Sequence, residues 1–188
     1  MTIIKPSMNL KEFSFNKEWT LFLDRDGVIN ERMVDDYVKT ASEFDFLPGV
    51  LQAIKIFTGI FGNILIVTNQ QGIGKGIMTE ADLQTIHSAM KYSIIVQGGK
   101  IGGIYYSPYL AGDNHMTRKP NPGMALQAKE DFPDTDFSKS VMVGDTENDI
   151  EFGKRLGMIT VHIGGVEQFD NFEPDYRFDS LLSFAKTL

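Results

Sequence analysis

Residues 19–27 read Trp19-Thr20-Leu21-Phe22-Leu23-Asp24-Arg25-Asp26-Gly27. A short apolar run that ends at two carboxylates indicates a buried strand followed by a polar turn. Gly27 permits the sharp backbone departure that lets both carboxylates face one site. Alone, an Asp-x-Asp-Gly sequence is as often a simple turn, so the other segments of the chain decide what this one means.

Four more short apolar runs follow, and longer amphipathic stretches separate them. This alternation predicts an α/β, Rossmann-like, doubly wound parallel sheet with helices on both faces. The predicted strands are 19–23, 63–67, 101–106, 141–143 and 159–163. The predicted helices are 49–59, 79–97, two that open at Pro122 and Glu147, and 181–186, with a surface loop over 170–175. Thr79 and Asp82 supply a capping box for the second helix, and Gly157 supplies a stop for the fourth.

Length, composition and charge limit the classes of protein that the chain can be. The 188 residues are 42% hydrophobic, which is enough for one core without metal or disulfide staples, so we expect a single domain over 1–188. We expect its core over about 19–165, between an N-terminal extension, 1–18, and a C-terminal loop and helix, 166–188. The formal net charge of −7 argues against a protein that holds nucleic acid by charge alone.

The chain has no cysteine and no long apolar segment. The lack of cysteine excludes disulfides, thiolate zinc sites, iron–sulfur clusters and a cysteine nucleophile. The first 18 residues lack the apolar stretch of a signal peptide, and the later apolar runs are too short to span a bilayer. We therefore expect a soluble, cytoplasmic protein without a membrane partner, either a monomer or a weak homodimer.

Polar side chains gather where three of the predicted strands end. The carboxyl ends of strands are the edge at which open α/β sheets bind ligands. Carboxylates that converge there from two strands suit a hard cation such as Mg²⁺. The sequence therefore predicts a magnesium and ligand site built from Asp24, Asp26, Thr68, Asn69 and Asp145.

Asp149 lies one helical turn after Asp145 and allows two interpretations. It could steady the metal site from behind the ligands. It could equally be a helix-start residue that the helix dipole favours. The sequence leaves both open.

Two further segments supply groups that suit phosphate oxygens. Residues 68–76 offer a hydroxyl, amides, backbone N–H groups and the cation of Lys75. They are not a Walker A loop, because no glycine stands five residues before Gly74, and Gly76 stands where that motif needs Ser or Thr. Arg118 and Lys119 precede a proline-started helix; alone they would more often be a solvated basic turn, but beside a carboxylate cluster they would balance charge and hold phosphate.

Taken together and in this order, these segments resemble the haloacid dehalogenase phosphohydrolase superfamily. Residues 23–30, 68–73, 118–124 and 143–145 are most similar to the branch that contains heptose-bisphosphate phosphatase and histidinol-phosphate phosphatase. The resemblance covers about residues 21–165. It implies a haloacid dehalogenase fold and a phosphoric monoester hydrolase.

The resemblance also implies a role for each matching residue. Asp24 would attack phosphorus and become an aspartyl phosphate, while Asp26 would act as general acid and then as general base. Thr68 and Asn69 would bond the phosphoryl oxygens, and Lys119 would neutralise developing charge and hold Asp24. The implied ligands of the Mg²⁺ cofactor are Asp24, the backbone carbonyl of Asp26, and Asp145.

Members of the superfamily often insert a cap domain between the first and second motifs or between the second and third. Here the intervals 24–68 and 68–119 each have room for one helix and one strand besides loops. We therefore expect a capless enzyme whose site is walled by loops 30–46, 70–78 and 107–118. Specificity would reside in those loops.

The third loop departs from the pattern of the branch, which usually carries a structural zinc held by Cys-x-His and Cys-x-Cys. Ser107, Tyr109, His115 and Thr117 stand at those positions. Only one of them could bind zinc, so we predict no structural zinc. A lone His115 is then expected to be a surface or pocket side chain. Because this loop helps to frame the leaving group, its change leaves the substrate open.

The expected activity is Mg²⁺-dependent hydrolysis of a small phosphorylated metabolite. D-glycero-D-manno-heptose 1,7-bisphosphate is the first candidate and histidinol phosphate the second. Arg118, Lys75 and Arg25 are the expected contacts to the non-transferred part of the substrate, and His87 and His162 are expected to be structural. A nucleic-acid 3′-phosphatase is opposed by the charge and by the lack of a basic, aromatic-rich groove. A non-catalytic phosphate-binding protein is opposed by the complete set of catalytic residues.

Overall fold

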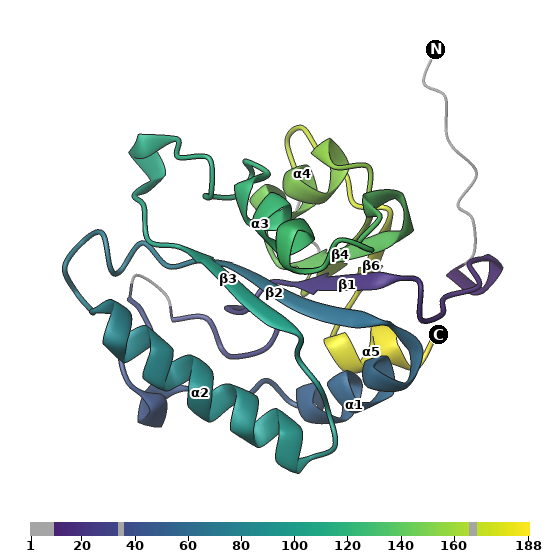
Figure 1. Cartoon of the computed structure of the whole chain (residues 1–188), viewed down its shortest axis with the longest axis horizontal. Coiled ribbons are helices and arrows are strands. Elements are labelled where there is room, and N and C mark those ends of the chain that lie inside the picture. Colours follow the sequence, from purple (N-terminus) through teal and green to yellow (C-terminus); the bar gives the residue numbers. More distant parts are fainter. Residues whose placement is uncertain (1–9, 34–35, 166–168) are drawn as a thin grey trace.

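The structure is a computed structural model that describes residues 10–33, 36–165 and 169–188. Its strands are β1 (Thr20–Leu23), β2 (Asn63–Asn69), β3 (Gly103–Ser107), β4 (Ser140–Gly144), β5 (Ile159–Ile163) and β6 (Tyr176–Phe178). They form one parallel sheet in the order β3-β2-β1-β4-β5-β6 (Figure 1). The predicted α/β sheet is confirmed.

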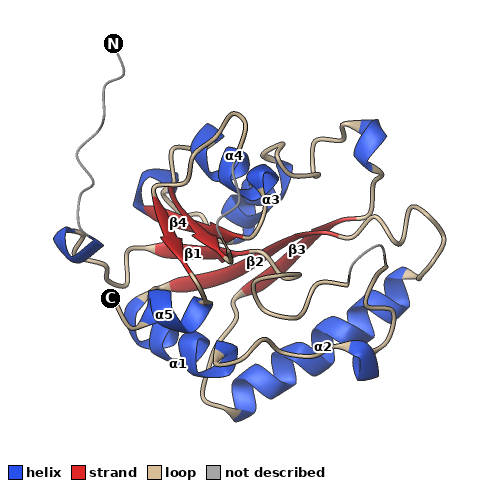
Figure 2. Ribbon diagram, turned by 180° about the vertical axis from the view of Figure 1, so that it is seen from behind, coloured by secondary structure: helices blue, strands red, loops and turns tan. Residues whose placement is uncertain are grey.

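Five helices cover the two faces of the sheet. They are α1 (Val50–Ile60), α2 (Glu80–Val96), α3 (Gly123–Asp131), α4 (Glu147–Arg155) and α5 (Leu181–Ala185). Helices α1, α2 and α5 lie on one face, and α3 and α4 on the other (Figure 2). Leu21 and Leu23 of β1 pack into the first layer and Phe22 into the second, because successive side chains of a strand point to opposite faces.

The position of β1 explains why the polar ends meet. Leu23 pairs with Ile66 of β2 on one side and with Val143 of β4 on the other. The chain proceeds from β1 through β2 to β3, then returns to add β4 on the opposite side of β1. The residues that follow these three strands therefore meet at a topological switch point, where sheets of this kind bind ligands.

Some predicted elements differ from those observed. The predicted count of five strands is wrong, because Tyr176–Phe178 adds a sixth at the edge; its three residues, none of them buried, are too few to establish a strand pattern. The first helix begins at Val50 because Gly49, at φ +77°, is left-handed. Strand β3 begins at Gly103, since the apolar Ile101 before it is a buried loop residue.

Other local predictions are confirmed. Thr79 and Asp82 form the capping box of α2, and Gly157 follows α4 at φ +73°. Parts of the predicted N-terminal extension, 1–18, of the loop 30–46 and of the C-terminal segment, 166–188, lie outside the described residues. No helix in the described ranges is long and apolar enough to cross a membrane.

Candidate active site

A cavity of about 610 Å³ opens at the carboxyl edge of the sheet. This volume is within the range of small-molecule sites. Asp24, Thr68 and Lys119 line it from the sheet side. All three predicted loops contribute to its wall, through Tyr37, Lys75 and Arg118. Within the described part of residues 24–119, helices α1 and α2, strands β2 and β3 and two three-residue 3₁₀ helices follow β1, so this part of the chain holds no inserted cap domain.

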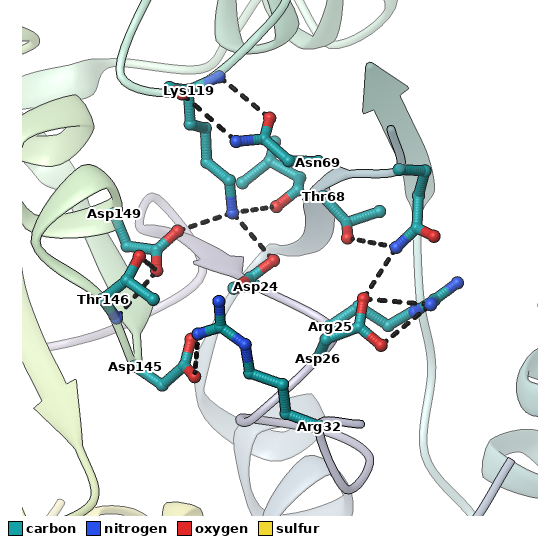
Figure 3. Close-up of polar contacts among 12 residues, drawn as sticks. Asp24, Arg25, Asp26, Arg32, Thr68, Asn69, Lys119, Asp145, Thr146 and Asp149 are labelled. Atoms are coloured by element: carbon teal, nitrogen blue, oxygen red, sulfur yellow. Dashed lines mark hydrogen bonds and ion pairs between the residues drawn. The ribbon is translucent and has the colours of Figure 1, made fainter. Parts of the chain in front are cut away.

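Lys119 is a buried cation between two carboxylates (Figure 3). Its Nζ lies 2.7 Å from Oδ1 of Asp24 and 2.6 Å from Oδ1 of Asp149, and it donates to the backbone oxygen of Val67 at 2.7 Å. Burial lowers the pKa of Lys119, but the two carboxylates outweigh this and raise it above its ordinary value. Lys119 is therefore charged and fixed beside Asp24.

Asn69 holds the backbone of Lys119. Its side-chain NH₂ donates to the backbone oxygen of Lys119 at 3.1 Å, and its Oδ1 accepts a hydrogen bond from the backbone N–H of Lys119 at 3.0 Å. The sequence predicted a phosphate contact for this side chain and did not reveal its role in positioning Lys119. The neighbouring Thr68 accepts a hydrogen bond from Gln70 at 2.9 Å. The hydroxyl proton of Thr68 is therefore available to an oxygen in the cavity.

Asp26 accepts hydrogen bonds from three residues. Arg25 Nη2 lies 2.8 and 2.9 Å from its two oxygens, Asn30 donates at 3.0 Å, and Gln70 donates at 2.7 Å. Burial raises the pKa of Asp26, but the charge of Arg25 and these hydrogen bonds outweigh it and hold the pKa below its ordinary value. This arrangement favours the carboxylate, whereas a general acid must carry a proton when substrate arrives.

Arg25, which the sequence predicted to contact substrate, lines the cavity but is already engaged by other side chains. Its side chain is 1% exposed, and its guanidinium is occupied by Asp26 and by His87, whose Nε2 lies 3.2 Å from Nη1. His87 is buried, as expected, but its contact with Arg25 was not foreseen.

Three carboxylates converge at the site. One oxygen from each of Asp24, Asp145 and Asp149 lies within 4.8 Å of the others. Burial is the main cause that raises the pKa of Asp24 to about 8 and that of Asp145 to about 6, and the charge of Asp149 raises both further. Oδ1 of Asp145 is buried and has no hydrogen-bond partner among the described residues. Crowded carboxylates with a free inward oxygen fit a hard divalent cation such as Mg²⁺.

Asp149 satisfies both interpretations that the sequence left open. Its Oδ2 accepts from the backbone N–H and hydroxyl of Thr146, at 3.0 and 2.6 Å, and so caps α4. Its Oδ1 meets Lys119. With both oxygens engaged, Asp149 supports the site from behind, and Asp24 and Asp145 remain the carboxylates suited to a metal.

Two glycines make this convergence possible. Gly27 has φ +88°, and a Cβ there would lie 2.1 Å from Oδ2 of Asp145. A Cβ on Gly144 would lie 2.0 Å from Cβ of Asp149. Both distances are far below contact, so a side chain at either position would displace a carboxylate.

Arg32 is a site residue that sequence reasoning missed. Its Nη1 lies 3.1 Å from Oδ2 of Asp145, and it lines the cavity. The only available signal was a cation soon after the Asp-x-Asp-Gly turn, because loops carry no periodicity. Lys75 also lines the cavity, with its Nζ 5.3 Å from the ring centroid of Tyr37.

The loop 107–118 is held together by direct side-chain contacts. The rings of Tyr109 and His115 stack with centroids 3.4 Å apart. Nδ1 of His115 lies 2.9 Å from Oγ1 of Thr117, which donates to Ser107 at 3.3 Å. Arg118 is fixed by donation to the backbone oxygen of Tyr109 at 2.9 Å. The four positions discussed for zinc therefore lie together and contact one another.

The chain is similar to several known proteins. A family model described as HAD-hydrolase-like matches residues 116–183. A D-glycero-alpha-D-manno-heptose-1,7-bisphosphate 7-phosphatase of Mycobacterium tuberculosis is 36% identical over 173 residues, covering 89% of this chain and 90% of the relative. A D-glycero-beta-D-manno-heptose-1,7-bisphosphate 7-phosphatase of Pseudomonas aeruginosa is 38% identical, with 89% and 96% covered. A crystal structure of D,D-heptose 1,7-bisphosphate phosphatase from B. bronchiseptica, with magnesium and phosphate, superposes with a TM-score of 0.78 at 28% identity, covering 89% of this chain and 96% of that one.

Proposed function

Because the chain belongs to the haloacid dehalogenase superfamily, in its heptose-bisphosphate phosphatase branch, we propose that it hydrolyses one phosphate ester of D-glycero-D-manno-heptose 1,7-bisphosphate. As a phosphoric monoester hydrolase it acts in carbohydrate metabolism. The observation that carries the proposal is the buried pair of Asp24 and Lys119 at the base of a cavity rimmed by cations. The ester removed is the one at C7, by analogy with the relatives.

In the proposed mechanism, a carboxylate oxygen of Asp24 attacks phosphorus, and the bond from phosphorus to the sugar oxygen breaks. The free protein holds Asp26 as a carboxylate, so Asp26 takes up a proton as the anionic phosphate binds beside it. It then gives this proton to the sugar oxygen, and later takes one from the water that hydrolyses the aspartyl phosphate. Thr68 donates its hydroxyl proton to a phosphoryl oxygen, and Lys119 balances the developing charge. The backbone of Asn69 offers a second phosphoryl contact.

The cofactor we propose is Mg²⁺, held by Asp24, the carbonyl of Asp26, and Asp145. The free inward oxygen of Asp145 supports this ligand set. When bound, the ion supplies positive charge that lets an anionic carboxylate approach an anionic phosphate. It would also favour the ionised form of Asp24 that attack requires.

We propose that three cations recognise the phosphate that is not transferred. Arg32, Lys75 and Arg118 all line the cavity, and they come from three different loops. Arg118 is the best placed, because its donation to Tyr109 fixes its direction. Arg25 also lines the cavity, but Asp26 and His87 engage its guanidinium, so we propose Arg32 as the third cation of this set.

Arg118→Ala is expected to raise KM for the heptose bisphosphate by about 10- to 100-fold, the worth of a charged hydrogen bond. KM for p-nitrophenyl phosphate, which has no second phosphate, should change less than about 3-fold because the reacting phosphate keeps its contacts. Steady-state kinetics on both substrates measures this. Arg155→Ala is the control, since Arg155 pairs with Glu151 and Asn121 outside the cavity. Equal effects on both substrates would contradict the assignment.

A kinetic panel tests the substrate, with and without Mg²⁺. It contains both anomers of the heptose bisphosphate, histidinol phosphate, nucleotides and a 3′-phosphorylated oligonucleotide. We expect the highest kcat/KM for a heptose bisphosphate. A higher value for histidinol phosphate would replace the proposed substrate, and activity on the oligonucleotide that falls steeply with salt would favour a nucleic-acid phosphatase. No hydrolysis of any ester would favour a phosphate-binding protein.

We further propose that residues 1–188 act as one phosphatase domain, in the cytoplasm and as a monomer or weak homodimer. The cysteine-free composition supports a reducing compartment. We also propose that loop 107–118 needs no structural zinc, because Tyr109, His115, Thr117 and Ser107 already connect it. Zinc analysis of the purified protein and sedimentation measurements test these statements.

A further inference from the structure

A buried line of contacts connects helix α2 to Asp26. His87, on α2, is 4% exposed, and its Nε2 lies 3.2 Å from Nη1 of Arg25. Nη2 of the same guanidinium lies 2.8 and 2.9 Å from the two oxygens of Asp26. His87 thus reaches Asp26 through one intermediate residue, although it lies outside all the sequence motifs.

The chemistry of the contact fixes the state of His87. Arginine has only donors, so Nε2 of His87 must accept the hydrogen bond and the ring proton must be on Nδ1. Burial, and then the charge of Arg25, lower the pKa of His87 to about 3. His87 is therefore a neutral acceptor over the working pH range. Its ring also packs edge-on against Tyr106, with centroids 6.2 Å apart.

Stability alone accounts poorly for this arrangement. Moving a guanidinium out of water costs several kcal/mol, which a buried ion pair recovers only with excellent geometry and satisfied donors. Nε of Arg25 is buried and lacks a hydrogen-bond partner among the described residues. The ring of Phe44, whose centroid lies 6.0 Å from Cζ of Arg25, offers only a weak further contact. The burial of Arg25 costs free energy, and its hydrogen bonds are incomplete. Its effect on Asp26 explains this arrangement better than a contribution to stability does.

We propose that His87 is a positioning residue for proton transfer, acting on Asp26 through Arg25. By accepting from Nη1, His87 keeps Nη2 of Arg25 directed at Asp26. Arg25 then determines where the Asp26 carboxylate lies before it meets substrate and where it returns after its proton has passed to the leaving oxygen. The inference rests on the proposed function, in which Asp26 is the acid.

Leaving-group dependence separates this role from a merely structural one. The sugar oxygen leaves as an alcohol and needs the proton of Asp26, whereas p-nitrophenolate leaves readily without one. The measured quantity is the ratio of kcat/KM for the heptose bisphosphate to kcat/KM for p-nitrophenyl phosphate. This parameter covers only the steps up to the first irreversible one, so the later activation of water does not enter it.

The decisive variants are His87→Asn and His87→Gln. Glutamine places an acceptor near the position of Nε2, whereas asparagine places it near Nδ1, too short to reach Arg25. We expect both H87N and H87L to lower the ratio of the two kcat/KM values by on the order of 10-fold. This is smaller than the loss expected when a general acid is removed completely. H87Q should retain a ratio within about 2-fold of the wild type, and D26N should show the largest fall.

Met90→Ala is the matched control, because Met90 is buried on the same helix and packs in the core. It should lower the melting temperature without changing the ratio. An unchanged ratio in H87N, with an active wild type, overturns the inference alone. A ratio that falls equally in H87Q, or in M90A, also overturns it. A wild type without activity on any ester overturns the proposed function.

Discussion

Asp24→Asn is expected to lower kcat by about 10⁴-fold or more, the scale on which enzymes lose rate when their nucleophile is removed. The amide has the shape of the carboxylate but no charge, so it cannot form the acyl phosphate. Steady-state kinetics with the heptose bisphosphate and with p-nitrophenyl phosphate measures the loss. Because the nucleophile serves both substrates, we expect both to fall together, unlike the effect of Arg118→Ala.

The same variant should fold at least as stably as the wild type when no metal is added. The folded pKa of Asp24, about 8, lies above its ordinary value of 3.8, so the folded state binds the proton more tightly than the unfolded state does. Ionisation of Asp24 therefore costs stability that is absent below about pH 4 and grows as pH rises toward 8. Asparagine removes this cost. Retained turnover in a well-folded D24N protein would contradict the phosphoenzyme mechanism.

Lys119→Met is expected to have the largest effect on stability. Removing the buried cation leaves Asp24 and Asp149 facing each other, and breaking a buried pair in this way costs about 3–5 kcal/mol. The free energy of unfolding from urea titration measures the loss at neutral pH. The kcat of the remaining folded protein should also fall if Lys119 balances charge on the reacting phosphate, as proposed.

Lys139→Met is the matched control for this variant. Lys139 also pairs with a carboxylate, that of Glu18, but the two side chains are 46% and 69% exposed. Solvent screens a pair this exposed, so this substitution should change stability little. If K119M were as stable as K139M, Lys119 would not be the cation that offsets the buried carboxylates.

The convergence of the reacting groups could be predicted because it follows from strand ends. A parallel sheet brings the residues after β1, β2 and β4 to one edge, whatever their separation in the chain. Asp24, Thr68 and Asp145 are therefore found where the sequence predicted them. Lys119 follows no strand, and its place was predicted from the resemblance rather than from the pattern.

Side-chain direction could not be predicted in the same way. Arg25 stands between two carboxylates in the sequence, yet its guanidinium is buried beneath the loops, because adjacent residues after a strand need not face the same space. Nothing in the sequence indicated the contact between Arg25 and His87, because Arg25 lies in the turn after β1 and His87 lies on α2. Arg32 was missed because it lies in an irregular loop, where no hydrophobic periodicity indicates the direction of a side chain.

The three loops of the cavity wall lie beyond the strand ends. The carboxylates and the hydroxyl proposed to act at phosphorus thus follow strands, whereas the cations proposed to recognise the rest of the ligand lie in loops. Changes in the length or charge of these loops can alter the cavity rim during evolution while the reaction stays the same. Proteins with this fold can therefore acquire new substrates through local substitutions at the cavity entrance, without a change in the reaction.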